Sequence, residues 1–256
     1  MNIGYPQSAP SRTAEELGVL NRIDARIRSV AASLGAEEIQ YPALIARGAL
    51  DRAEYPKAFP HLLMSAGQSA VFDDHGISQW CLSPAVCYHA YAQLAGRVLD
   101  APLVITARGR CFRAERELVH GVRQIEFEMR EIVLLGAADW VDRAADSARL
   151  AVESIAADLS LTGDWQAAED PFFLPAAAGK ALMQRLLKVK LEYQWPGPGG
   201  LALASINRHG PFFGQRFDIS TADGQPAFTA CIAVGLDRLA HHAQPSAGGC
   251  REEVTQ

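Results

Sequence analysis

The sequence lacks any apolar run of membrane-spanning length, and its first thirteen residues lack the charged and hydrophobic regions of a signal peptide. It also lacks an excess of basic residues, since 24 Lys and Arg stand against 29 Asp and Glu, for a formal charge of −5. That balance excludes an overall electrostatic footprint for nucleic acid, although a local basic patch stays open. We therefore expect a cytoplasmic protein with no membrane contact.

Cysteine is scarce, and its pattern excludes a secreted disulfide framework. The number is odd and the positions are widely spread, whereas disulfide-stapled domains carry even sets at short spacings. The chemistry of single thiolates, including metal binding, stays open. The five cysteines are Cys81, Cys87, Cys111, Cys231 and Cys250.

The length and composition are sufficient for one large domain. With 256 residues, 49% of them hydrophobic, the chain can bury a substantial core, and no second globular unit is evident. We expect this domain to occupy residues 13–242, with flexible termini at residues 1–12 and 243–256.

Two helix starts are marked by capping residues. Thr13 and Glu16 form a capping box ahead of an amphipathic stretch. Ser83, followed by proline, is expected to cap a second helix, with Cys87 in its first turn. Because a helix N-terminus carries partial positive charge, this position favours a thiolate at Cys87.

Apolar and alternating segments predict strands mixed with helices. Two antiparallel strands are expected at 103–112 and 124–135, followed by an amphipathic helix over 139–159. Without a strict alternation of strand and helix, the pattern favours an α+β domain built on an antiparallel sheet flanked by helices. The remaining expected elements are a helix at 176–187, strands at 188–194, 201–207, 214–220 and 227–234, and a closing helix from Leu236.

One carboxylate stands on an otherwise apolar strand face. Residues 125, 127, 129, 131 and 133 share a face at period two, and only Glu131 among them is polar. A buried carboxylate stays ionised only if a cation or hydrogen-bond donors meet it, so Glu131 is predicted to contact a ligand or substrate. Glu126 and Glu128 lie on the opposite face, where we expect them to be solvated or to pair with Arg130.

The order of three short motifs resembles class II aminoacyl-tRNA synthetases. Phe112-Arg113-x-Glu115 with Phe127-x-Met129-Arg130-Glu131 resembles motif 2, and Gly235-Leu236-Asp237-Arg238 resembles motif 3. Glu37 to Pro42 resembles motif 1, whose proline lies at a dimer interface in that superfamily. The run from Ser83 to Tyr88 and the strand before Gly235 narrow the resemblance to amino acid:[carrier protein] ligases. These are truncated relatives of the zinc-dependent seryl-type synthetases.

The resemblance implies a class II synthetase-like catalytic domain and assigns an ATP site. Arg113 would contact the α-phosphate and the amino acid carboxylate, and Arg238 would hold the γ-phosphate and cover the adenine. Phe127 would stack on the other face of the adenine, and the Glu115 carboxylate would accept a hydrogen bond from the adenine amino group. Arginine suits these roles because its guanidinium is planar, permanently charged and bidentate. Magnesium would accompany the ATP.

The resemblance also implies one zinc ion per chain, held by Cys87, Glu131 and Cys231. Three protein ligands leave a fourth position for the amino group of the substrate. On residue type alone, each of these cysteines is more commonly a small buried hydrophobe. Glu128 is an alternative ligand if the strand register differs.

Four further polar residues are candidates for the wall of the amino acid pocket. These are Lys190, Glu192, Ser205 and Asn207. A cross-strand ion pair explains the first two nearly as well.

Three functions compete at this point. The first is a ligase that activates a small amino acid, with glycine or alanine favoured, as its adenylate and passes it to the phosphopantetheine thiol of a carrier protein. The second is a seryl-type synthetase that charges tRNA, against which the acidic balance stands. The third is a non-catalytic paralogue, which would have no need of Arg113, Arg238 and the zinc ligands together. We favour the ligase, expect a homodimer, and expect no tRNA as partner.

Overall fold

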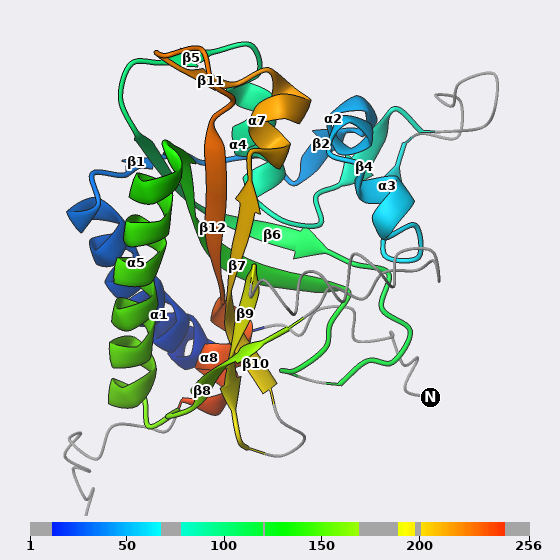
Figure 1. The fold of residues 1–256 in the computed structure, drawn as a ribbon. Coiled ribbons are helices and arrows are strands. Elements are labelled where there is room, and N and C mark those ends of the chain that lie inside the picture. The colour runs from blue at the N-terminus through cyan, green and yellow to red at the C-terminus, as the bar shows by residue number, and fades with distance from the viewer. Residues whose placement is uncertain (1–11, 68–77, 120, 169–188, 198–200, 244–256) are drawn as a thin grey trace, which may run out of the picture.

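A computed structural model describes residues 12–67, 78–119, 121–168, 189–197 and 201–243. It confirms an α+β architecture, in which a large mixed sheet is flanked by helices (Figure 1). Its helices are α1 (Ala14–Ser33), α2 (Arg47–Arg52), α3 (Tyr55–Ala58), α4 (Cys87–Gln93), α5 (Ala138–Asp158), α7 (Phe212–Phe217) and α8 (Leu236–His242). Its strands are β1 (Glu37–Glu38), β2 (Leu44–Ala46), β3 (Ser65–Ala66), β4 (Trp80–Leu82), β5 (Val98–Leu99), β6 (Leu103–Phe112), β7 (Glu126–Gly136), β8 (Asp164–Ala167), β9 (Lys190–Trp195), β10 (Leu201–Gly210), β11 (Ser220–Thr221) and β12 (Phe228–Gly235).

Seven strands form the central sheet in the order β1-β6-β7-β12-β10-β9-β8. All neighbours in it are antiparallel except β1 and β6. The two long strands β6 and β7 pair along their whole length, as the sequence predicts. A smaller three-stranded sheet, β2-β4-β3, and a two-stranded pair, β11-β5, stand beside the central sheet.

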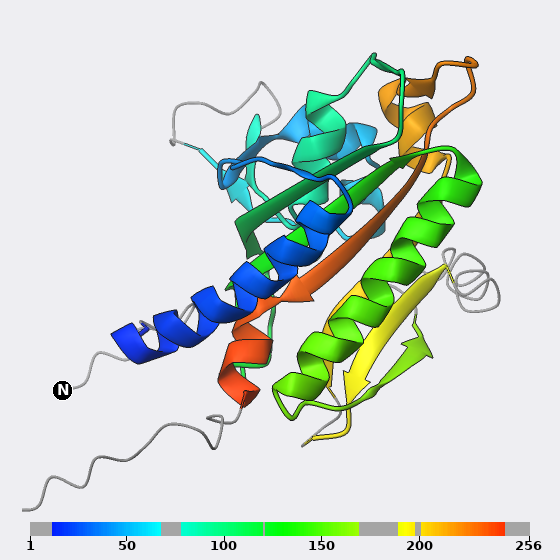
Figure 2. The same ribbon diagram turned by 90° about the vertical axis from the view of Figure 1, so that its left-hand side faces the viewer.

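The two faces of the central sheet carry separate apolar cores. Helices α1 and α5 lie side by side on one face, with α8 nearby (Figure 2), and their buried residues pack with those of β7, β10 and β12. On the other face, α4 and α7 pack a second core around Tyr91, Phe213 and Phe217. Burial of this apolar surface is the main stabilising contribution to the fold. None of the helices in the described part of the chain is long and apolar enough to cross a membrane.

The capping box that opens α1 is confirmed, whereas the predicted cap of α4 is wrong. The Glu16 amide donates to Thr13 Oγ1 at 3.2 Å, and the Glu16 carboxylate accepts from the Thr13 amide at 2.7 Å. Helix α4 begins at Cys87, and the Ser83 hydroxyl instead donates to the Ala85 carbonyl at 2.9 Å. The Val86 and Cys87 amides at the helix start donate instead to Glu131, a residue distant in sequence, which takes the place of a local capping side chain.

The strand predicted over 214–220 is wrong. Residues Phe212–Phe217 form helix α7, and of the predicted segment only Ser220 is strand, at the start of β11. The apolar Phe212, Phe213 and Phe217 follow helical spacing as well as an alternating pattern, and packing on α4 decides for the helix. The helix predicted at 176–187 lies outside the described residues.

The polar face of β7 is paired differently from the sequence expectation. Arg130 is buried and donates to Asp24 of α1 at 2.5 Å and to Glu38 of β1 at 2.9 Å. Glu128 is buried beside Arg108, whose Nε donates to it at 2.6 Å, and Arg12 also bonds it. Glu128 therefore pairs with arginines, and it does not belong to the group of potential metal ligands around the two cysteines. This excludes the alternative register that would have made it a metal ligand.

Gly214 provides a test of the packing between α7 and the backbone just before β12. A Cβ at this position would overlap the backbone oxygen of Ala227, which cannot move without displacing the chain. We expect Gly214→Ala to lower the free energy of unfolding by about 1–3 kcal/mol. The matched control is Gly48→Ala in α2, where a Cβ meets open space and the helix gains stability. Urea unfolding of both variants measures the effect, and equal stabilities would contradict this account of the packing.

Candidate active site

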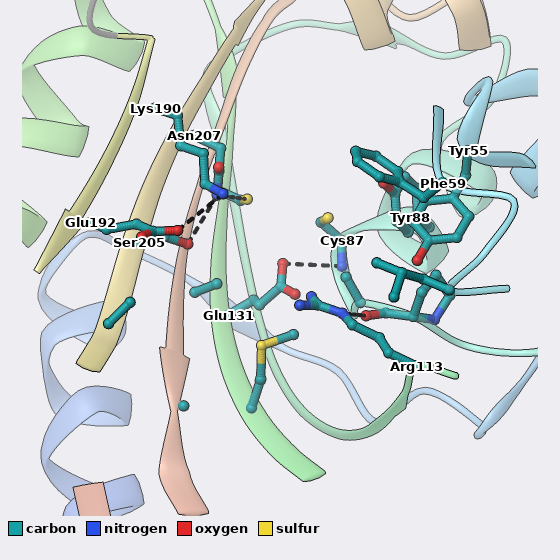
Figure 3. A pocket seen from close by; sticks show the side chains of 18 of the residues that line it. Tyr55, Phe59, Cys87, Tyr88, Arg113, Glu131, Lys190, Glu192, Ser205 and Asn207 are labelled. Carbon is teal, nitrogen blue, oxygen red and sulfur yellow. Dashed lines mark hydrogen bonds and ion pairs between the residues drawn. The ribbon is translucent and has the colours of Figure 1, made fainter. Parts of the chain in front are cut away.

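A cavity of about 870 Å³ lies over β7, β10 and β12, between these strands and the segment from α3 to α4. Every site residue proposed from the sequence lines it. The shared lining residues are Cys87, Arg113, Glu115, Phe127, Glu131, Lys190, Glu192, Ser205, Asn207, Cys231 and Arg238. Figure 3 shows Glu131 in the middle, Cys87 and Arg113 on one side, and the four polar candidates on the opposite wall. Residues far apart in sequence therefore converge on one hollow.

The sheet register explains this convergence. Phe127 and Glu131 share a face of β7 at period two, and β12 runs beside them with Ala233 opposite Glu131. On the next strand, Asn207 stands opposite Cys231. The central strands thus present the carboxylate, the thiol and the amide on the face that borders the cavity.

Two arginines lie in the cavity, and no acidic side chain of the described residues forms a hydrogen bond or ion pair with either of them. Arg113 Nε donates to the Pro84 carbonyl at 3.3 Å, and Arg238 donates to the carbonyls of Val122 and Ala202 at 2.9 and 2.7 Å. Burial lowers the pKa of Arg238, and the charge of Arg113 lowers it further. Two cations held near each other in a partly buried hollow favour a bound anion.

An aromatic ring stands under the first of these arginines. The Arg113 guanidinium lies 5.1 Å from the centre of the Phe127 ring, within cation–π range. The nearby Glu115 carboxylate lies 3.9 Å from Arg123 Nε, so it is oriented by a residue of the loop between β6 and β7. A flat apolar ring, a hydrogen-bond acceptor and two guanidiniums could meet the base and the phosphates of a nucleoside triphosphate.

Cys87, Glu131 and Cys231 form the one group of three potential metal-ligating side chains in the described part of the chain. Their ligand atoms all lie within 4.8 Å of one another, and all three residues are buried. Glu131 also accepts the Val86 amide at 2.9 Å and the Cys87 amide at 3.2 Å (Figure 3). It thereby ties the start of α4 to β7 and fixes Cys87 beside itself.

The protonation of this cluster differs from the sequence expectation of a thiolate at Cys87. The interaction with Cys231, together with burial and the nearby carboxylate, raises the pKa of the Cys87 thiol. The same interaction lowers the pKa of Cys231, with help from His209 and Asn207. Burial and the charge of Cys231 raise the pKa of Glu131 to about 8. Of the two thiols, Cys231 therefore has the lower pKa, because Cys87 is buried between two acidic groups.

The donor set of this cluster fits a zinc ion. Two thiols and a carboxylate within 4.8 Å are the ligand types that zinc binds, and three ligands leave a position open. Burial and the charge of Cys231 raise the pKa of Glu131, and the interaction with Cys231, together with burial, raises the pKa of Cys87, so repulsion between acidic groups contributes to both shifts. A dication would relieve that repulsion. The residues therefore fit the metal that the resemblance implies.

The opposite wall is polar and internally bonded. Lys190 Nζ lies 3.0 Å from Glu192, and Asn207 Nδ2 donates to Ser205 Oγ at 3.2 Å (Figure 3). The ion pair joins residues two apart on the same strand, β9, so the predicted cross-strand pair is wrong in detail. These groups border the cavity close to Cys231, and they could meet the polar atoms of a bound substrate.

Two sets of lining residues escaped the sequence interpretation. His209 lies beside Cys231, and the aromatic Tyr55, Phe59 and Tyr88 form an apolar wall beyond Arg113 (Figure 3). A single histidine ahead of a glycine carries no local signal. The aromatic residues lie in a segment of irregular pattern, whose position over the site depends on packing against α4.

Comparison of the sequence with known proteins identifies the family of the chain. No family model matches the chain. The chain is 33% identical to amino acid–acyl-carrier-protein ligase 1 of Bradyrhizobium diazoefficiens, over 90% of its own length and 77% of that protein. It is 34% identical to ligase 2 of the same organism, over 90% of its length and 75% of that protein. The chain belongs to this ligase family.

More distant similarities agree with the architecture. The type-2 serine–tRNA ligase of Methanocaldococcus jannaschii is 26% identical over 62% of the chain, which spans 33% of that protein. Seryl-tRNA synthetase from M. kandleri, solved in complex with A. aeolicus tRNASec, superposes with a TM-score of 0.71 at 21% identity. Prolyl-tRNA synthetase from Giardia lamblia with prolyl-adenylate gives 0.74 at 16% identity. The chain covers about half of each solved chain, 51% and 48%, so it has the class II synthetase catalytic fold without their full length.

Proposed function

We propose that the protein activates a small amino acid, with glycine or alanine favoured, and transfers it to the phosphopantetheine thiol of a carrier protein. The observation that carries this proposal is the single cavity in which the two arginines and the Cys87–Glu131–Cys231 cluster meet. The named family members, which are acyl-carrier-protein ligases, support the acceptor.

In the first step, a carboxylate oxygen of the amino acid attacks the α-phosphorus of ATP, and pyrophosphate leaves. Negative charge spreads over the phosphoryl oxygens in this reaction, so positioned cations accelerate it. Arg113 would neutralise the α-phosphate and orient the carboxylate. Arg238 would hold the γ-phosphate, with Phe127 and Glu115 holding the adenine. Magnesium would accompany the phosphates.

The amino acid would lie between Arg113 and the cysteine cluster. Cys87, Glu131 and Cys231 would hold the zinc ion, one per chain, which supplies a Lewis-acid site for a free amino group. Recognition of the amine selects amino acids as a class. The size of the substrate side chain would be limited by the polar wall of the pocket, which consists of Lys190, Glu192, Ser205 and Asn207. A preference between glycine and alanine rests on about one methylene of contact, which is worth only about 1–3 kcal/mol.

In the second step, the thiol sulfur attacks the carbonyl carbon of the adenylate, and AMP leaves as the thioester forms. We propose a homodimer in the cytoplasm, in keeping with the motif 1 resemblance of residues 37–42. Transfer to tRNA is the competing proposal, because the chain also resembles serine–tRNA ligases at 24–28% identity.

A parallel acceptor assay tests the proposal. The activated enzyme is offered holo-carrier protein and total tRNA in separate reactions with radiolabelled glycine or alanine. We expect label on the carrier protein, lost when its phosphopantetheine is absent, and none on tRNA. Label on tRNA alone would replace the ligase with a tRNA synthetase, and label on neither, with no adenylate formed, would favour a non-catalytic paralogue.

A further inference from the structure

A β-bulge in β10 positions a histidine beside the proposed metal site. The pairing of β10 with β12 shifts between Arg208, opposite Ala230, and Gly210, opposite Thr229, and leaves His209 as the extra residue. Gly210 has a φ of +57°, which glycine adopts at little cost. Bulges next to active sites commonly redirect one side chain. The side chain redirected here is the imidazole of His209.

The imidazole is held at both of its nitrogens. His209 Nε2 lies 3.8 Å from Cys231 Sγ, while Nδ1 lies 3.4 Å from the Tyr91 hydroxyl and 3.3 Å from the Thr229 hydroxyl. Tyr91 and Thr229 are both fully buried. The ring of Phe213 packs edge-on against the imidazole at 4.7 Å. This surrounding set fixes the plane of the ring.

The partners decide where the imidazole proton lies. A cysteine sulfur that ligates a metal only accepts hydrogen bonds, so the nitrogen that faces it must donate. A neutral imidazole that donates from Nε2 accepts at Nδ1, and the Tyr91 and Thr229 hydroxyls can each donate there. The chain of contacts is therefore consistent in one tautomer, with the proton on Nε2.

We propose that His209 is the positioning residue for Cys231, and that its Nε2 hydrogen bond holds the sulfur toward Cys87 and Glu131. This inference rests on the proposed metal site. Asn207 Nδ2 donates to the same sulfur at 3.5 Å from two residues earlier on β10, so two donors hold Cys231. His209 falls outside the group of three whose ligand atoms lie within 4.8 Å of one another. It therefore acts on the site through Cys231 and not as a ligand.

The test compares zinc affinity in two variants of this residue. His209→Phe keeps a flat ring and loses the donor, whereas His209→Gln keeps an N–H near the position of Nε2. We expect the phenylalanine variant to bind zinc about 10–100-fold more weakly than wild type in competition with a chelator. The glutamine variant should recover most of that loss. Thermal unfolding of the metal-free proteins controls for misfolding, and Thr229→Val, which removes one donor to Nδ1, provides a milder second variant.

A second readout does not depend on metal. Nitrogen-15 NMR of the metal-free protein should report a proton on Nε2 of His209, with Nδ1 accepting from the Tyr91 and Thr229 hydroxyls. The Nδ1–H tautomer would overturn the proposal, as would equal zinc affinities in wild type, His209→Phe and His209→Gln. A glutamine variant as weak as the phenylalanine one, with an altered cobalt spectrum, would make His209 a direct ligand. A wild-type protein that binds no zinc would overturn the metal site itself, whereas the other results count against His209 alone.

Discussion

Arg113→Ala should reduce amino-acid-dependent ATP–pyrophosphate exchange by at least about 10³-fold, because the arginine would lie where charge develops in the adenylation step. Among the described residues, this guanidinium contacts the Pro84 carbonyl and the Phe127 ring and bonds no carboxylate, so its charge is available to a substrate. The loss should fall on the maximal rate as well as on ATP binding. Exchange rates over a range of ATP concentrations separate the two.

The controls for this prediction come from the same strand region. Arg110 points to solvent and bonds Glu126 on the neighbouring strand, so Arg110→Ala should leave exchange within about twofold of wild type. Arg113→Lys keeps the charge but loses the planar fork, and it should fall between wild type and the alanine variant. Full exchange in Arg113→Ala, with the protein folded, would remove Arg113 from the catalytic machinery.

The residues that the sequence singles out all line one cavity, whereas the path of the chain around that cavity was predicted less well. Period-two alternation on β7 placed Phe127 and Glu131 on one face, because burial fixes strand register and a slip of one residue would turn every side chain over. The capping box of α1 is equally local and was also correct. The position of Cys231 beside Glu131 was available only through the family resemblance.

Long-range contacts account for the errors. The start of α4 depends on Glu131, which is 44 and 45 residues away from the amides that it accepts. The helix α7 depends on stacking between Tyr91 and Phe213, whose ring centres are 4.2 Å apart. The bulge that presents His209 depends on pairing with β12, and it cannot be predicted from a single glycine in the sequence. Local secondary-structure propensity does not predict such contacts, since tertiary packing decides them.

Zinc binding should depend strongly on Cys231. The wild-type protein should carry roughly one zinc ion per chain, and Cys231→Ala should weaken zinc binding by at least about 100-fold. The physical reason is that Cys231 is one of three potential ligands within 4.8 Å of one another, so its removal leaves only two, and its pKa is lowered by the interaction with Cys87. Metal analysis after dialysis against a chelator measures the loss.

Cys81 provides the matched control for this substitution. It is a buried free thiol like Cys231, but it packs in the small apolar cluster around Ile45 and Leu50, away from Glu131. Cys81→Ala should therefore keep the zinc at a similar cost in packing.

Loss of zinc should also abolish ATP–pyrophosphate exchange in wild-type protein treated with a chelator, and added zinc should restore it. A zinc-free protein with full exchange would refute the ligand set, and the cluster would then serve only to join α4 to the sheet through Glu131.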